Sequence, residues 1–377
     1  MKKTLSICLA VILAVTLSLS AFAVKAPSKE SVRKEIDAAV VYITGEVSGY
    51  TADNAVDYYY LVNTSEKANA FYDGFLESIR ANLDANSGKI VTAYGENISS
   101  YAAVIGIIDA MGGDPTNVNS VNLVELFEKL DNKEVSSPYF YNIIVPVAAK
   151  YCDEAFVKSI CDSFIENYYT VGSGMNYWGF ACDNTAMFIS AISQSGLDCY
   201  DSVLTDAVNI LNSYKGNGGY FYNPEYGTAP NVNSTGLALM AKCAYYTYKG
   251  TVNDNADELS DLYNSLLTFK GQTEGSYTYD GTESTYSAAD ALKGLYAYYS
   301  VLPENTPDSP DVTPDKPDTK PNTPNVTEPS TDNNGETNKN PDIPNTDGGV
   351  SVISFGAMSL GIIIASFLIG KKEENID

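Results

Sequence analysis

A unit of about 50 residues recurs along the chain and constrains its fold more than any other feature. Each copy has a glycine- and aromatic-rich loop, then a cluster of Asp, Asn, Ser and Thr residues, then a stretch of small and apolar residues. Because such a cluster can cap a helix N-terminus, each unit predicts one helix and a second helix that returns. The clearest copies lie at residues 177–186, 218–240 and 275–289, and fainter ones at residues 92–102 and 136–139.

Apolar residues recur at helical spacing through nearly all of residues 24–302, and Gly, Asn, Asp and Pro residues separate the segments. Alternation with the period of a β-strand is almost absent. We therefore expect an all-α domain, with at most short hairpins near residues 220–226 and 276–282. The twelve expected helices cover residues 32–43, 55–61, 68–83, 101–111, 123–130, 139–149, 155–168, 185–193, 203–214, 235–248, 259–269 and 286–299.

The loop motif Gly218-Gly219-Tyr220, followed by residues 234–239, resembles that of the α/α-toroid superfamily. This superfamily includes squalene and terpene cyclases, protein prenyltransferases and cobalamin carriers of the transcobalamin and intrinsic factor type. The resemblance covers residues 30–301 and is strongest over 175–301. It implies an (α/α)6 toroid of six helical hairpins in two concentric rings, with the inner-helix N-termini at one mouth. The unpaired N–H groups and partial positive charge of that mouth would suit polar or anionic ligands.

The segments outside this domain predict secretion and a membrane anchor. Residues 1–23 have the basic start, apolar stretch and small-residue end of a signal peptide. Residues 303–349 hold 10 of the 16 prolines and no aromatic residue, so we expect a disordered stalk. Residues 350–370 are apolar and uncharged, which predicts one transmembrane helix, and the lysines that open residues 371–377 predict a cytoplasmic tail. The large domain is thus expected on the cell surface.

The segment Ile343-Pro344-Asn345-Thr346-Asp347 precedes the apolar span. It resembles the Leu-Pro-x-Thr-Gly cell-wall sorting signal of Gram-positive surface proteins. Two positions depart from that signal, Ile343 and Asp347, and the second stands where the glycine after the cleaved threonine should be. Covalent attachment to the cell wall therefore stays open, whereas a membrane anchor needs only the apolar span.

Composition removes several function classes. The chain has 23 Lys and Arg residues against 47 Asp and Glu residues, and the net charge of -24 opposes nucleic-acid binding. It contains no histidine, so Ser-His-Asp catalysis and the His-containing zinc site of protein prenyltransferases are absent. The Asp-x-Asp-Asp acid of terpene cyclases and the Cys-Gly-Glu-Gln thioester motif are also missing. These absences favour a non-catalytic toroid that has no cofactor, unless a corrinoid is bound as its ligand.

Aromatic and polar residues near the loops are the candidate ligand contacts. They recur ahead of the predicted inner helices, so they should converge on one end of the ring. Their rings could stack on a sugar or a planar macrocycle, or could instead seal the gaps between hairpins. The candidate ligand-binding residues are Tyr177, Trp178, Asp183, Tyr220, Tyr222, Tyr226, Asn231, Asn233, Tyr277, Tyr279, Glu283 and Tyr286.

Three functional hypotheses follow. The main one is a surface-anchored, non-catalytic toroid that binds an extracellular ligand, either a carbohydrate or a corrinoid. Residues 183–187 and 233–239 look like the inner-helix starts of cobalamin carriers, which implies the corrinoid. The first alternative is an extracellular glycan hydrolase or lyase that uses paired carboxylates. The second alternative is an adhesin that binds a partner protein through its outer surface. If the protein is an enzyme, the candidate catalytic residues are Asp183, Glu225, Asp280 and Glu283.

Simpler structural roles compete for two of these carboxylates, and a disulfide is possible. Asp183 could cap the helix that follows it, and Asp280 precedes a glycine as turn residues do. The odd number of cysteines after residue 23 leaves at least one unpaired. A bridge between Cys182 and Cys199 across one hairpin is one interpretation, and scattered buried thiols are the other.

Deleting residues 350–377 should release the protein into the medium, because the apolar span is the predicted anchor. Immunoblots of cells and medium measure the distribution. A variant with a shortened stalk that lacks residues 310–335 serves as the control and should stay with the cells. Retention of the 350–377 deletion on the cells would contradict the anchor.

Overall fold

The computed structural model describes residues 27–130, 135 and 137–303. The predicted signal peptide, stalk and transmembrane segment lie outside these ranges. Among the described residues, no helix combines the length and apolar character needed to cross a membrane. Helices dominate, and the strands form two-residue hairpins, so the all-α prediction is confirmed.

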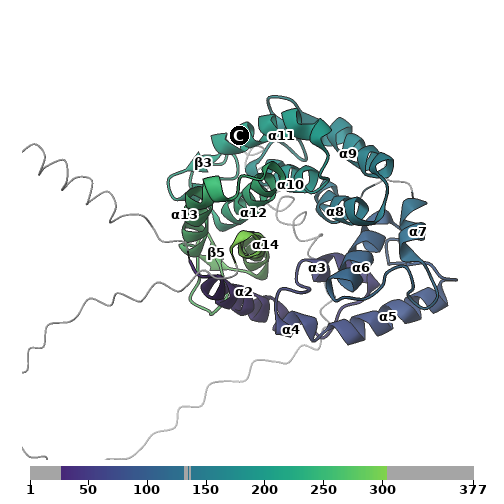
Figure 1. The fold of residues 1–377 in the computed structure, drawn as a ribbon. Helices are drawn as coiled ribbons and strands as arrows, with labels where there is room; N and C mark the ends of the chain where they lie inside the picture. Colours follow the sequence, from purple (N-terminus) through teal and green to yellow (C-terminus); the bar gives the residue numbers. More distant parts are fainter. Residues whose placement is uncertain (1–26, 131–134, 136, 304–377) are drawn as a thin grey trace, which may run out of the picture.

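The described helices form two concentric rings (Figure 1). Consecutive inner helices pack against one another, and the outer helices cover them. The inner ring contains α3 (Ala55–Tyr59), α6 (Ile98–Ala110), α8 (Tyr141–Tyr151), α10 (Cys182–Ser193), α12 (Val232–Lys249) and α14 (Thr285–Val301). The outer ring contains α2 (Lys29–Thr44), α4 (Glu66–Asn69), α5 (Tyr72–Ala85), α7 (Leu123–Glu128), α9 (Glu154–Tyr168), α11 (Asp201–Ser213) and α13 (Ala256–Leu267). The chain is therefore an (α/α)6 toroid, as predicted.

Burial explains why two kinds of helix alternate along the chain. Every residue of α10 is buried, because this inner helix is covered on all sides. By contrast, α11 buries a single stripe: Leu204, Ala207, Val208 and Leu211. Spacings of three, one and three residues place these side chains on one face, which packs inward and leaves the opposite face in solvent.

The twelve predicted helices are all present, and the differences lie mostly at their ends. The helix predicted over residues 68–83 is divided into α4 and α5, and α10 and α12 each begin three residues earlier than predicted. Their starts were misplaced because the polar cluster of each repeat lies inside the first turn rather than before it. Short 3₁₀ turns precede four helices: η1 (Ala52–Asn54), η2 (Pro138–Phe140), η3 (Asp198–Tyr200) and η4 (Asn253–Asn255).

The glycine-rich loops fold as small antiparallel hairpins between an outer helix and the next inner helix. They are β1 (Tyr169–Thr170) with β2 (Gly174–Met175), β3 (Lys215–Gly216) with β4 (Gly219–Tyr220), and β5 (Thr278–Tyr279) with β6 (Thr282–Glu283). The sequence predicted the last hairpin approximately, placed the second about five residues too late at 220–226, and missed the first. Gly219 has φ 143°, and a Cβ atom there would lie 2.5 Å from Thr235 Oγ1. Glycine is thus required where a loop packs against the start of the next inner helix.

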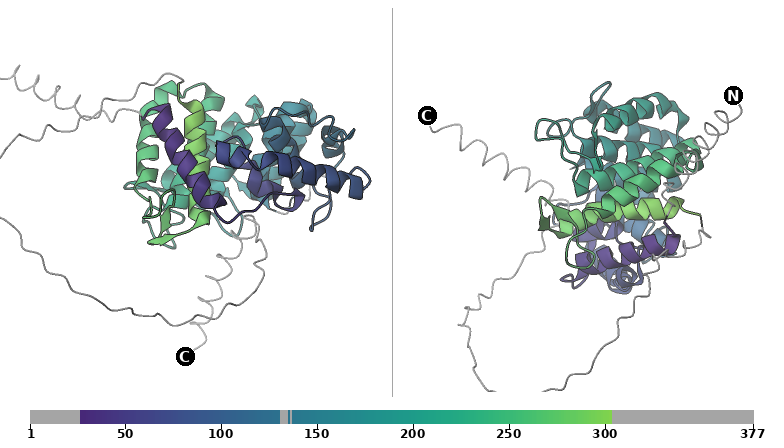
Figure 2. Two further views of the ribbon diagram at one scale, coloured as in Figure 1. Left: turned by 90° about the horizontal axis from the view of Figure 1, so that it is seen from below. Right: turned by 90° about the vertical axis from the view of Figure 1, so that its left-hand side faces the viewer.

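The last helical hairpin, formed by α13 and α14, closes the ring against α2, the first described helix. Figure 2 shows α2 beside α14 in both views. Lys270, which follows α13, forms an ion pair of 2.7 Å with Glu35 on α2. The Lys29 ammonium lies 4.8 Å from the centroid of the Tyr299 ring on α14. These contacts join the two ends of residues 27–303 into one domain.

The cysteines do not form the predicted bridge. The five cysteines of the described residues are all free. Cys182 is buried on α10, where its thiol lies 3.9 Å from the Ser234 carbonyl oxygen, whereas Cys199 is exposed in η3. The interpretation of a Cys182–Cys199 disulfide is therefore wrong, because the two side chains belong to different layers of the toroid.

Helices α12 and α14 cross with their backbones in contact. A Cβ atom on Gly236 would lie 2.5 Å from the Asp290 carbonyl oxygen, and one on Gly294 would lie 2.5 Å from the Gly236 carbonyl oxygen. No real Cβ atom tolerates such a distance to rigid backbone. The two glycines therefore set the separation of these inner helices.

A Gly236→Ala variant should lose about 1–3 kcal/mol of unfolding free energy, because the added methyl group forces α12 away from α14. Urea unfolding of the purified protein measures the loss. The matched control is Gly74→Ala on α5, where the Cβ atom meets open space and helix propensity predicts a gain of up to about 1 kcal/mol. Equal unfolding free energies for the two variants would contradict the packing argument.

Candidate functional site

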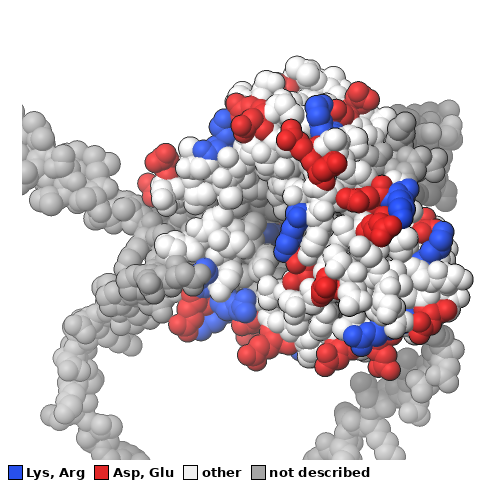
Figure 3. All heavy atoms as spheres, turned by 45° about the vertical axis from the view of Figure 1, so that its right-hand side comes forward, with Lys and Arg blue, Asp and Glu red and all other residues white. Residues whose placement is uncertain are grey.

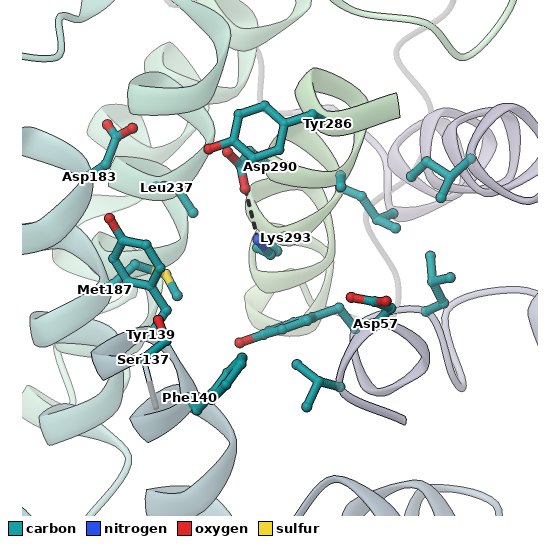
Figure 4. Close-up of a pocket in the computed structure, with 16 residues that line it drawn as sticks. Asp57, Ser137, Tyr139, Phe140, Asp183, Met187, Leu237, Tyr286, Asp290 and Lys293 are labelled. Atoms are coloured by element: carbon teal, nitrogen blue, oxygen red, sulfur yellow. Dashed lines mark hydrogen bonds and ion pairs between the residues drawn. The ribbon is translucent and has the colours of Figure 1, made fainter. Parts of the chain in front are cut away.

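A pocket of about 90 Å³ lies inside the inner ring, and we call it the central pocket (Figure 4). Residues from α2, α3, η2, α10, α12 and α14 line it. Most of its wall is apolar or aromatic. Its polar side chains are Asp57, Tyr60, Ser137, Tyr139, Asp183, Tyr286, Asp290 and Lys293. Ionisable groups with so little contact with water need specific partners.

Asp183 projects from the first turn of α10. The helix begins at Cys182 with Ala181 at its cap, so Asp183 is not the N-cap that the sequence allowed. Its side chain is 9% exposed, and Ser234 Oγ donates a hydrogen bond of 2.6 Å to it. Burial raises the pKa of Asp183 to about 7, with a contribution from Asp290, against the lowering effect of the Ser234 hydrogen bond. The carboxyl group therefore exchanges its proton near neutral pH.

Asp290 lies on α14 and is 2% exposed. Its carboxylate forms an ion pair of 2.7 Å with Lys293 Nζ, one turn further along the helix. It also accepts a hydrogen bond of 2.8 Å from Asn233 Nδ2 on α12. These two of the three aspartates that line the pocket therefore have different environments: Asp290 has an ion-pair partner, and Asp183 accepts a hydrogen bond from a neutral hydroxyl.

Two tyrosine hydroxyls accompany the carboxyl groups. Figure 4 shows Tyr139 and Tyr286 pointing toward the space between Asp183 and Asp290. Burial, together with these negative charges, raises the pKa of both hydroxyls well above 10. Tyr139 donates a hydrogen bond of 2.5 Å to Asn184 Oδ1. Both phenols therefore stay neutral and can donate or accept hydrogen bonds at physiological pH.

This arrangement supports proton transfer between a bound group and two carboxyls. One carboxyl can hold a proton at neutral pH, and the other is paired with a lysine. Where two titratable groups have such contrasting environments, the acid and base roles of a catalytic pair can be separated. Within the described part of the chain, no group of three or more Cys, Asp and Glu side chains is placed to hold a metal ion.

The structure brings three of the predicted site residues together. Asp183 and Tyr286 line the central pocket, and Asn233 holds Asp290 from the side. Tyr220 and Tyr277 are instead fully buried in the hydrophobic core. The two candidate ligand contacts that line the central pocket, Asp183 and Tyr286, therefore both lie on inner helices.

The predicted loop aromatics pack on one another and do not line the central pocket. The Tyr177 ring lies 5.5 Å from that of Tyr139 and 6.1 Å from that of Trp178. Tyr222 and Tyr226 form a similar pair at 6.1 Å. Trp178 is 66% exposed, and Tyr226 and Tyr279 are also exposed.

The remaining polar candidates have local structural contacts. The Asn231 side chain accepts the Ser234 N–H at 2.9 Å and so caps α12. Glu283 accepts the Thr273 N–H at 3.0 Å, and the hydrogen bonds from Thr273 lower the pKa of Glu283 to about 2. Glu225 lies in an exposed loop and Asp280 in the exposed β5–β6 turn. Of the four candidate catalytic carboxylates, only Asp183 lines the central pocket.

Sequence reasoning missed Tyr139, Asp290 and Lys293. A signal for two of them was present: Tyr286, Asp290 and Lys293 recur at spacings of four and three residues in a segment of otherwise small and apolar residues. Such spacing places side chains on one face of a helix. Nothing in the sequence indicated that this face meets Asp183.

The acidity of the chain is separate from the pocket. Figure 3 shows acidic side chains spread over the face in view, with basic side chains among them. The charge of -18 over residues 24–302 is therefore a property of the surface, and the protonation of Asp183 depends on nearby groups.

Comparisons with known proteins give few relatives. No family model matches the chain, and no curated protein is similar to it in sequence. Among solved structures, a polysaccharide lyase is similar with a TM-score of 0.49 and 11% identity, over 72% of this chain and 97% of that chain. A glycosyl hydrolase of family 88 from Bacteroides vulgatus has a TM-score of 0.49 and 10% identity, over 73% of this chain and all of that chain.

The raised pKa of Asp183 predicts a pH-dependent stability. The folded protein binds this proton more tightly than the unfolded chain, so the contribution is full below about pH 4 and is lost as the pH rises through about 7. Asp183→Asn should remove this dependence. The unfolding free energy of the variant should therefore rise relative to wild type between pH 4 and pH 8, by at most about 4 kcal/mol.

Urea unfolding at a series of pH values measures this difference. Asp280→Asn, in an exposed turn, is the matched control, and its difference from wild type should stay constant with pH. A constant difference for Asp183→Asn as well would show that Asp183 does not retain its proton on folding.

Proposed function

We propose that the protein is a glycan-active enzyme that breaks a glycosidic bond by general acid–base catalysis in the central pocket. The observation that carries this proposal is the pair of Asp183 and Asp290, which line one pocket in contrasting environments. Two carboxyl groups suffice for this reaction. One protonates the leaving oxygen, and the other activates water or stabilises the positive charge that develops on the sugar.

The environments of Asp183 and Asp290 favour different catalytic roles for the two carboxyl groups. Asp183 is the general acid, because a pKa of about 7 lets it hold and release a proton at neutral pH. Asp290 is the anionic partner, and Lys293 and Asn233 keep its carboxylate in place. The Tyr139 and Tyr286 hydroxyls bind hydroxyl groups of the sugar.

The pocket supports catalysis better than non-catalytic ligand capture. Its volume of about 90 Å³ is small beside the roughly 300–1,000 Å³ of pockets that enclose a drug-sized ligand, and a corrinoid is larger still. Burying two carboxyl groups is also costly, and a site that only binds has no need of them. The two structural neighbours are too distant to add weight. With the signal peptide and anchor predicted from the sequence, we place this activity at the cell surface.

Turnover of a glycan panel tests the proposal. The panel contains neutral and acidic polysaccharides and oligosaccharides, and product is measured as new reducing ends or as an ultraviolet-absorbing unsaturated sugar, which separates hydrolysis from elimination. Asp183→Asn and Asp290→Asn should each lower kcat/KM by about 10²–10⁴-fold. In the wild-type enzyme, kcat/KM should fall above about pH 7 as Asp183 loses its proton.

Glu225→Gln and Asp280→Asn are the matched controls, since both carboxylates lie in exposed loops, and both variants should keep wild-type rates. Wild-type rates in folded Asp183→Asn would refute the assignment. So would the absence of any turnover across the panel.

A further inference from the structure

A second and larger cavity occupies the other end of the ring. Its volume is about 690 Å³, and we call it the C-terminal cavity. It is lined by residues 190–194 of α10 and its C-cap, and by side chains from residues 240–248 of α12 and 293–301 of α14. These are the later turns of the inner helices, whereas the glycine-rich loops precede their first turns. The cavity therefore lies away from the mouth that the sequence predicted as the binding site.

The two cavities adjoin. Tyr60, at the end of α3, and Lys293 line both of them. The Lys293 ammonium lies 4.9 Å from the centroid of the Tyr60 ring, so these two side chains stand at the boundary. Lys293 is also the ion-pair partner of Asp290. A ligand in the C-terminal cavity can therefore contact the lysine that pairs with Asp290.

Size separates the roles of the two cavities. The central pocket has room for little more than a few water-sized groups, whereas 690 Å³ is within the range of sites that enclose an organic ligand. The C-terminal cavity therefore has the room that a larger substrate needs.

The walls suit an uncharged ligand that is rich in hydroxyl groups. Tyr59, Tyr248 and Tyr296 offer aromatic faces. The two acidic and two basic side chains of the wall balance, and Asp109 pairs with Lys150 at 2.6 Å.

Two lining side chains also carry polar atoms in need of a partner. Asn142 and Ser193 are only 4% and 5% exposed. Within residues 27–130, 135 and 137–303, neither Asn142 Oδ1 nor Ser193 Oγ has a hydrogen-bond partner. Buried polar atoms without a partner are costly, but both atoms lie beneath the cavity wall, and a ligand would reach them only if these side chains turned toward the cavity.

From these observations we infer that the C-terminal cavity binds a neutral oligosaccharide, namely the part of the glycan that extends beyond the bond cleaved in the central pocket. The inference rests on the proposed function. It makes the face where the inner helices end, rather than the aromatic loops, the side from which the chain reaches Asp183 and Asp290.

The inference is tested by measuring oligosaccharide binding to a variant in which a larger side chain occupies part of the C-terminal cavity. Ala244 lines the C-terminal cavity and not the central pocket, so Ala244→Trp should occupy part of its space. The probes are cellopentaose, mannopentaose and xylopentaose, their disaccharides, and trigalacturonate as a charged comparison. Titration calorimetry on the full protein that carries Asp183→Asn measures binding without turnover. At least one neutral pentaose should bind, and Ala244→Trp should weaken that binding at least tenfold.

Two further variants keep the test decisive. Tyr296→Ala removes an aromatic face without adding bulk and should also weaken the pentaose, which covers the case in which Ala244→Trp does not fold. Thr205→Trp, on the exposed face of α11, is the control for an added tryptophan and should bind as the parent does. Equal pentaose affinity in the folded cavity variants and the parent, or tighter binding of trigalacturonate than of every pentaose, would overturn the inference.

Failure of this inference can be told from failure of the proposed function. If Ala244→Trp with an intact Asp183 turns over pentaoses with the wild-type KM, binding in the C-terminal cavity is refuted and the acid–base pair is still supported. Pentaose binding that is lost in Ala244→Trp, without turnover by wild type, would support the cavity and refute the catalytic role.

Discussion

The backbone contact between α12 and α14 is the constraint on which the rest of the site depends. Gly236 and Gly294 let the two helices approach to a distance that no side chain would permit. Only at that separation can Asn233 on α12 reach Asp290 on α14, while Ser234, one residue further on, reaches Asp183 on α10. One hydrogen bond thus joins α12 to α14, and another joins α12 to α10. The packing of α12 therefore orients both carboxyl groups.

Burial inside the ring also supplies what the composition lacks. The chain has no histidine, the side chain that ordinarily titrates near neutral pH. In the toroid a carboxyl group takes over that range, because removal from water and the nearby charge of Asp290 raise the pKa of Asp183 to about 7. The same surroundings leave Tyr139 and Tyr286 neutral. A low-dielectric interior therefore generates an acid for neutral pH from ordinary residues.

The glycine-rich loops of the repeats mainly pack against and cap the inner helix that follows them. Gly219 packs against Thr235, Asn231 caps α12, and Tyr222 packs beside Tyr226, so the repeat was a reliable guide to architecture. It was a weaker guide to the site. Repeats align the loops at one end of the ring, but the ionisable groups lie deeper, and the larger cavity is at the opposite end. The repeated loop motif makes the packing contacts that the hairpins have in common, whereas the central pocket uses side chains that do not recur from one hairpin to the next.

The sequence by itself determined the all-α class and the positions of most helices, because hydrophobic periodicity and helix capping act within a few residues along the chain. The closed double ring was predicted from the resemblance of the repeated motif to the α/α-toroid superfamily. The sequence also placed Asp183 among four candidate catalytic carboxylates. Only the tertiary structure decided that Asp183 and Asp290 line one pocket, that Lys293 forms its ion pair with Asp290, and that Glu225 and Asp280 stay in solvent. Those facts depend on how closely α10, α12 and α14 pack, and on which side chains lose contact with water as the ring closes. Neither property can be read from local spacing, because each is set by residues far apart in the sequence.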